Sequence, residues 1–121
     1  MDATSTLDFT TGALAEGLHC YRTGRFWEAH EFWEGVWLAS PEPEKTLLQC
    51  LIQISAALHH LQRGNAVGAT SLLTRALRRL EPFPAGYCGV RVEVIRSSVR
   101  AWLAALHKGD IAPGLEFPSI P

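Results

Sequence analysis

The chain has 121 residues, of which 47% are hydrophobic and 19% are charged, and its formal net charge is −1. This composition excludes a disordered or collagen-like chain, and the near balance of charge argues against a nucleic-acid binder held by excess positive charge. From the length we expect a single helical domain over residues 1–121, with its core over about 9–108 and a Pro-rich extended tail over 109–121.

Sequence features that report on compartment point to the cytoplasm. No apolar stretch is long enough to span a membrane, and the first residues lack the basic and apolar regions of a signal peptide. The three cysteines, Cys20, Cys50 and Cys88, are an odd number without a CxxC pair. They indicate buried thiols in a reducing compartment rather than a disulfide framework, with Cys88 expected to be the most reactive.

Glycine and proline breaks separate five segments with helical periodicity. We expect helices over residues 11–23, 25–38, 43–63, 65–80 (with Asn65 as N-cap) and 90–108. Leucine and isoleucine cover most of the circumference of the third segment, which is typical of a central helix. The sequence therefore predicts an all-α fold, a compact bundle of about five helices built from two αα-hairpins and a C-terminal helix.

An internal similarity at an offset of 40 residues supports the two hairpins. Leu18-His19 precedes Gly24 and Ala29, and Leu58-His59 precedes Gly64 and Ala69 in the same way. Each unit predicts a helix, a glycine break and a second helix with a small residue, as in tetratricopeptide-like repeats. In the tail, Leu115, Phe117 and Ile120 are apolar enough to occupy a groove of the same chain or of a neighbour, and a loose tail is the alternative.

The second predicted helix carries the densest set of aromatic and titratable side chains. At 100° per residue, six of them share one face: Phe26, Trp27, His30, Trp33, Glu34 and Trp37. Glu31 lies at the edge of this face, Glu28 points away from it, and Phe32 lies on the opposite side. The arrangement predicts a titratable pair, His30 and Glu34, inside an aromatic wall.

The third predicted helix carries a narrow polar stripe. Gln49, Gln53 and His60 share it with alanines that allow close approach of another helix. If the first hairpin packs on this stripe, Gln53 or His60 could satisfy His30 or Glu34. The candidate polar cluster then comprises nine residues: Glu28, His30, Glu31, Trp33, Glu34, Trp37, Gln49, Gln53 and His60.

Three interpretations of this cluster stay open. The first is a buried hydrogen-bond network. The second is a divalent-metal site with His30, Glu34 and His60 as ligands and Glu31 as the catalytic general base of a metal-assisted hydrolase, since His-Glu-Phe-Trp-Glu resembles the HExxH pattern. The third is a small-molecule or peptide pocket lined by Trp33 and Trp37.

The function that follows is a cytoplasmic helical bundle whose His/Glu/Gln cluster is structural or binds a small ligand. The enzyme interpretation is the weaker alternative, and no cofactor is firmly implied. A further alternative is a protein–protein interaction module that uses the hairpins and Phe32 to hold a homodimer or protein partner. We expect neither nucleic acid nor membrane as a partner.

Three blocks in order resemble the domain of unknown function 309 family. They are Phe-Trp-Glu-Ala-His-Glu at 26–31 with Trp33, Glu34 and Trp37, then residues 48–60, and then Arg63-Gly64-Asn65 with Gly68-Ala69. The likeness covers about residues 9–107 and implies a small all-helical protein of bacteria or chloroplasts, with no established activity. The family pattern has characteristic positions at Glu28, His30, Glu31, Glu34, Gln53 and His60. Cys50 and Arg91 depart from it, standing where glycine and an acidic residue are common.

Overall fold

The computed structural model describes residues 7–109 and 118–120. It contains five α-helices: α1 (Gly12–Arg22), α2 (Phe26–Ala39), α3 (Glu44–Gln62), α4 (Ala66–Leu80) and α5 (Val92–His107). The all-α class is confirmed, and each helix begins and ends within two residues of its predicted bounds. No helix in the described part of the chain is both long enough and apolar enough to cross a bilayer.

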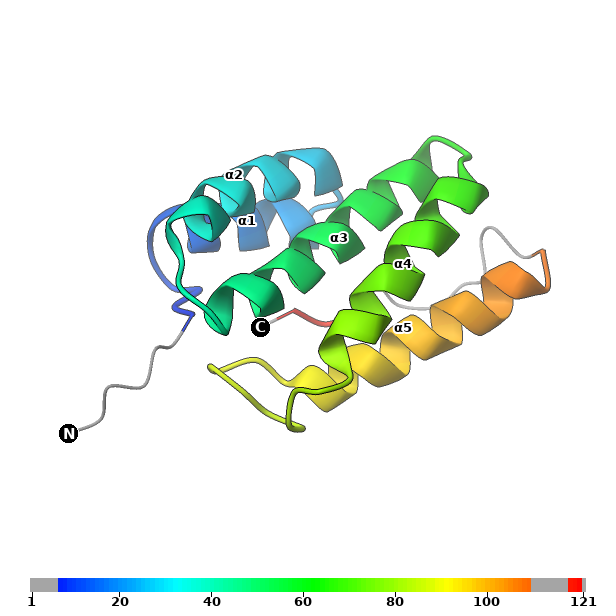
Figure 1. The fold of residues 1–121 in the computed structure, drawn as a ribbon. Coiled ribbons are helices and arrows are strands. Elements are labelled where there is room, and N and C mark those ends of the chain that lie inside the picture. The colour runs from blue at the N-terminus through cyan, green and yellow to red at the C-terminus, as the bar shows by residue number, and fades with distance from the viewer. Residues whose placement is uncertain (1–6, 110–117, 121) are drawn as a thin grey trace.

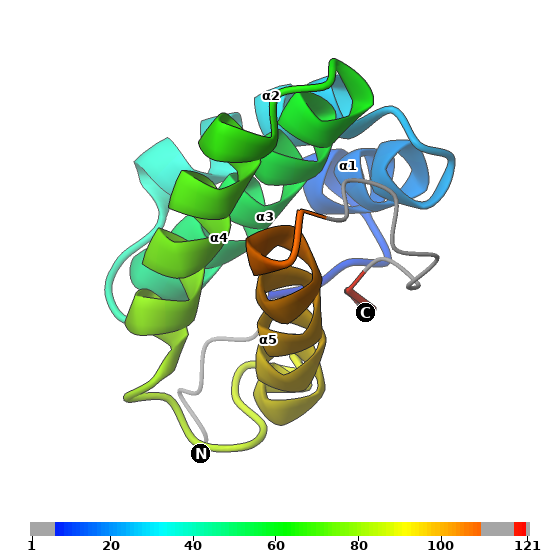
Figure 2. The same cartoon turned by 90° about the vertical axis from the view of Figure 1, so that its right-hand side faces the viewer.

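Helices that follow one another in the chain pack against one another, α1 on α2, α2 on α3, α3 on α4 and α4 on α5 (Figure 1). The predicted central position of α3 is confirmed, because eleven of its residues are buried. Leu47, Leu48, Leu51 and Ile54 are completely buried along it. The view in Figure 2 shows α5 closing the bundle beside α4.

The two hairpin turns repeat the same hydrogen bonds at an offset of 40 residues. The Arg25 amide donates to the Cys20 carbonyl at 2.8 Å, and the Asn65 amide donates to the His60 carbonyl at 2.8 Å. Gly24 and Gly64 occupy the turns with φ of +81° and +76°, a left-handed conformation that favours glycine. The internal similarity in the sequence is thus a structural repeat of one helix–turn–helix geometry.

Each repeat places an alanine where its second helix meets the core. Ala29 and Ala69 are both completely buried. Asn65 is the N-cap of α4, as predicted, and its side chain accepts a hydrogen bond from the Gly68 amide at 2.9 Å. Arg25, the corresponding residue of the first turn, makes no side-chain cap, so the two turns share backbone geometry but not capping chemistry.

A buried arginine joins α5 to the end of α4. The guanidinium of Arg96 donates to the carbonyls of Leu80 at 2.7 Å and Phe83 at 2.8 Å. It also pairs with the carboxylate of Glu93, one turn earlier in α5, at 2.8 Å. The carbonyls at the end of a helix have no partner within the helix, so Arg96 acts as a side-chain cap for α4.

Residues 118–120 lie against α1. The Tyr21 hydroxyl donates a buried hydrogen bond of 2.7 Å to the Pro118 carbonyl, and the Arg22 guanidinium lies 3.5 Å from the Ile120 carbonyl. Ile120 is 2% exposed. Of the alternatives that the sequence leaves open for the tail, Ile120 follows the first, a groove of the same chain, whereas Leu115 and Phe117 lie outside the described residues.

Candidate functional site

The aromatic face of α2 is divided between two neighbouring helices. Phe26 and Trp33 are buried, whereas Trp27 is 43% exposed. The prediction of one continuous face is therefore wrong in detail. Because α2 packs on α1 on one side and on α3 on the other, side chains that share a broad face in projection enter different environments.

Trp33 belongs to the contact between α1 and α2. Its indole N–H donates to the Leu14 carbonyl at 3.2 Å, and its ring meets Phe9 edge-on with centroids 6.2 Å apart. A Cβ built on Gly17 would lie 2.3 Å from the indole Nε1, so only glycine leaves room for this ring. Trp33 is completely buried, and its predicted role in the wall of an open pocket is wrong.

The other part of the face joins a row of four rings that crosses from α2 to α3. Trp27 stacks on His30 with centroids 4.5 Å apart and contacts His59 at 5.1 Å, and His59 contacts His60 at 6.1 Å. The polar stripe predicted His60 as a member of the site but not His59. Its position directly before His60 was the only signal, because the angular projection placed it outside the polar stripe.

A second contact between the two helices lies at the opposite end of α2. The ammonium group of Lys45 lies 4.9 Å from the centroid of the Trp37 ring. We call the strip from the Trp27–His59 contact to the Trp37–Lys45 contact the α2–α3 seam. Gln49 and Gln53 lie between Lys45 and His59 along α3, and both are half-buried.

Polar atoms along the seam are incompletely paired. His30 Nε2 lies 3.9 Å from Glu34 Oε2, and His60 Nδ1 lies 3.1 Å from the Asn65 amide nitrogen. Within residues 7–109 and 118–120, four buried side-chain atoms have no hydrogen-bond partner, and three belong to the predicted cluster: His30 Nδ1, Trp37 Nε1 and Gln53 Oε1. The expectation that an amide of α3 closes a hydrogen-bond network with His30 is therefore wrong.

The surroundings of His59 disfavour its charged form. Burial lowers the pKa of His59, and the positive charge of Arg63 and the neighbouring His60 lower it further, whereas Glu28 acts in the opposite direction. Loss of hydration disfavours the charged imidazolium. His59 is therefore held in its neutral form at pH values where an exposed histidine begins to protonate.

Three predicted metal ligands are not gathered into one group. In the part of the chain that the structure describes, no set of three or more His, Cys, Asp or Glu side chains is placed to hold a metal ion, and this includes His30, Glu34 and His60. Glu28 and Glu31 are exposed on α2. They contribute negative charge beside the seam.

The surroundings of Cys88 do not favour the high reactivity that the sequence predicted for its thiol. It is 8% exposed, and burial raises its pKa, as does the negative charge of Glu44. Burial also raises the pKa of Cys50 to about 12. A thiol reacts as its thiolate. Because a raised pKa lowers the thiolate fraction, neither Cys88 nor Cys50 is an activated nucleophile.

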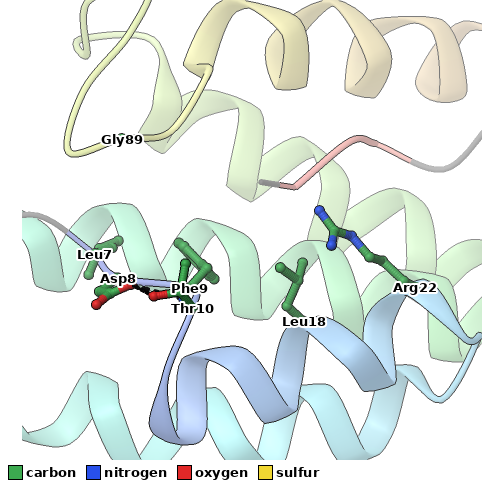
Figure 3. A pocket seen from close by; sticks show the side chains of 7 residues that line it. All are labelled: Leu7, Asp8, Phe9, Thr10, Leu18, Arg22 and Gly89. Carbon is green, nitrogen blue, oxygen red and sulfur yellow. Dashed lines mark hydrogen bonds between the residues drawn. The ribbon is translucent and has the colours of Figure 1, made fainter.

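A pocket that no sequence pattern predicted lies between the segment before α1, α1 itself and the loop before α5. It has a volume of about 520 Å³ and is lined in part by Asp8, Leu18, Arg22 and Gly89. Figure 3 shows Arg22 extending from α1 towards the C-terminal segment, where it meets the Ile120 carbonyl. Arg22 therefore both lines this pocket and contacts the C-terminal segment.

Taken together, these features define a small helical domain of two stacked αα-hairpins with a polar and aromatic seam between them. Residues 14–72 match the model of the family described as Domain of unknown function (DUF309). The match confirms the resemblance found in the sequence, over a shorter range than expected. It contains every residue of the predicted cluster and ends inside α4.

A relative from Aquifex aeolicus (strain VF5), described as "Uncharacterized protein", is 30% identical over 98 residues. The alignment covers 80% of this chain and 29% of the relative. The chain thus spans less than a third of the length of that relative.

Proposed function

We propose that the chain is a protein-interaction module that binds an extended, positively charged peptide segment along the α2–α3 seam. The observation that carries this proposal is the group of three unpaired polar atoms, His30 Nδ1, Trp37 Nε1 and Gln53 Oε1. A shielded polar atom without a partner costs about 1–3 kcal/mol. A ligand that pairs with these atoms therefore removes a penalty that the free chain carries.

The chemistry of the three atoms selects the ligand. The Trp37 indole N–H is a donor, the Gln53 carbonyl oxygen is an acceptor, and the imidazole of His30 serves as either. A peptide backbone offers both N–H donors and C=O acceptors at regular spacing. All three side chains are half-buried, so pairing with a peptide requires each of them to turn until its shielded atom faces the solvent.

The charge beside the seam favours a basic peptide. Glu28, Glu31 and Glu34 are exposed on α2, and Lys45 is held over the Trp37 ring. The Trp27 ring, 43% exposed, offers a face on which a lysine or arginine side chain can rest. Carboxylates and an aromatic face together attract cationic side chains more strongly than neutral ones.

The length of the seam sets the length of the peptide. Trp27 and Trp37 are ten residues apart in α2, which corresponds to about 15 Å of helix. An extended chain covers this distance with about five residues. A pentapeptide with alternating lysines is therefore a sufficient probe.

The test is a titration with acetyl-Lys-Ala-Lys-Ala-Lys-amide, followed by backbone amide NMR shifts. We expect saturable shifts confined to α2 and α3, weaker binding of the Trp27→Ala and Gln53→Leu variants, and no binding of the peptide with glutamates in place of lysines. Phe32→Ala is the matched control, because Phe32 is 41% exposed on α2 and takes no part in the row of rings.

Three outcomes would contradict the proposal. One is the absence of saturable shifts, and another is equal binding of the acidic peptide. The third is a loss of binding in Phe32→Ala but not in Trp27→Ala, which would place the interaction on the other side of α2.

A further inference from the structure

A buried carboxylate outside the seam lies beside a second cavity. Glu44, the first residue of α3, is 7% exposed. Its Oε1 atom is shielded from solvent and has no hydrogen-bond partner. No residue within 7–109 or 118–120 forms an ion pair with it. A buried carboxylate oxygen without a donor carries a desolvation penalty, which a cationic hydrogen-bond donor would remove.

The cavity beside Glu44 is open and has a volume of about 430 Å³. Asp8 supplies a second carboxylate to its lining, and Thr11 and Ser40 supply hydroxyl groups. Hydrogen bonds from the side chain and backbone of Thr10 lower the pKa of Asp8, so this group stays ionised. All four side chains can accept hydrogen bonds, and no basic side chain lies among the lining residues.

The rest of the lining is aliphatic. Leu7, Leu14 and Val36 form this part together with Ala13 and Pro41. The negative field of Glu44 extends beyond the cavity, where it contributes, after burial, to the raised pKa of Cys88. The surroundings therefore combine hydrogen-bond acceptors and negative charge with a surface that suits a short hydrocarbon chain.

From this geometry we propose that the cavity binds a primary ammonium group carried on a short aliphatic chain, with Glu44 and Asp8 holding the ammonium and the Leu7–Leu14–Val36 wall holding the chain. An ammonium has three N–H donors and no acceptor, which matches a lining of carboxylates and hydroxyls. Hydrogen bonds between charged groups are the stronger class, and a shielded site strengthens them further.

The experiment is a titration of the full chain with n-butylammonium chloride at neutral pH and low salt, followed by backbone amide shifts. We expect saturable shifts at residues 11–14 and 40–45. The Glu44→Gln variant should bind about tenfold more weakly or worse, as loss of a charge-assisted hydrogen bond requires. Asp8→Asn should weaken binding in the same direction. Glu16→Gln, at an exposed glutamate of α1 outside the cavity, should bind as the original chain does.

Two further ligands separate ammonium recognition from its alternatives. n-Butanol carries the same hydrocarbon chain without charge, and magnesium chloride carries charge without the chain. The proposal fails if butanol shifts the same amides with equal affinity, or if magnesium binds there and butylammonium does not. It also fails if Glu44→Gln and Asp8→Asn both leave the affinity for butylammonium unchanged. A lysine side chain is itself a butylammonium group, so variants separate the two proposals. Glu44→Gln should weaken butylammonium binding and leave binding of the pentapeptide unchanged, whereas Trp27→Ala should do the reverse.

Discussion

Trp33 and Gly17 fit together so closely that a Cβ on Gly17 would lie 2.3 Å from the indole Nε1 and 2.6 Å from Cδ1. The ring cannot retreat, because it is completely buried and is held by its hydrogen bond to the Leu14 carbonyl. This pair sets the distance between α1 and α2 and thereby the position from which Trp27 and His30 reach the seam.

Replacing Gly17 by alanine should therefore destabilise the chain, although alanine is the better helix former. We expect a loss of about 1–3 kcal/mol in the free energy of unfolding, typical of an overpacked core. Gly35→Ala is the control, because a Cβ there meets nothing within 4 Å in a helix, and it should stabilise by about 0.4–1 kcal/mol. Urea denaturation of both variants measures the two effects, and a stabilised Gly17→Ala would show that the ring can move.

Removal of the arginine cap should loosen the connection between α4 and α5. Arg96→Met deletes the donors to the Leu80 and Phe83 carbonyls, and we expect a loss of about 2–4 kcal/mol because buried acceptors lose their partner. Arg78→Met, at an exposed arginine of the last turn of α4, should change stability by less than about 0.5 kcal/mol. Equal thermal midpoints for the two variants would contradict the capping role.

His59 should give the chain a dependence of stability on pH with a definite sign. Its pKa in the folded chain is lowered, so the unfolded chain takes up the proton first as the pH falls. The contribution of His59 to stability is therefore present above the ordinary histidine pKa of about 6.5 and is lost as the pH falls from there to the folded pKa. His59→Gln should flatten the stability curve in this window.

A histidine side-chain NMR titration checks the cause directly. The His59 resonance should titrate at lower pH than the ordinary histidine value of about 6.5. A midpoint at the ordinary value would show that burial and the Arg63 charge do not act on His59.

The attachment of residues 118–120 should contribute measurably to stability. Burial raises the pKa of Tyr21, so its hydroxyl remains a donor to the Pro118 carbonyl throughout the accessible pH range. Tyr21→Phe should cost about 1–3 kcal/mol by leaving that carbonyl unpaired, and Ile120→Ala should cost about 2–4 kcal/mol through the cavity it leaves. Ser119→Ala changes an exposed residue of the same segment and serves as the control. Urea unfolding distinguishes them, and three equal midpoints would mean that the segment does not hold to α1.

The helices were predictable because their signals are local. Gly24 and Gly64 end their helices by adopting a conformation that other residues avoid, and the Asn65 cap needs only the Gly68 amide three residues away. The internal repeat could also be found without knowing how the helices pack, because the residue types that one turn requires recur 40 residues later.

The candidate site was predictable only to the level of its helices. Projection of α2 onto a helical wheel places Trp27 and Trp33 on one face. It cannot show that Trp33 packs against α1 while Trp27 contacts His59 of α3. Which side chains meet depends on the positions of three helices in space. His59 was missed for the same reason, and Glu44 was missed because no periodic pattern marks the segment before α1 that lines the same cavity.

The backbone hydrogen bonds that the two hairpin turns share make the number of residues in each turn critical for this fold. One additional residue in either turn would rotate the following helix by about 100° about its axis. The side chain of Ala29 or Ala69 would then leave its buried position in the core, and a larger side chain of the same helix would have to occupy that position. Insertions and deletions should therefore be rejected at residues 23–25 and 63–65, although both turns are at the surface, where chain length usually varies most freely.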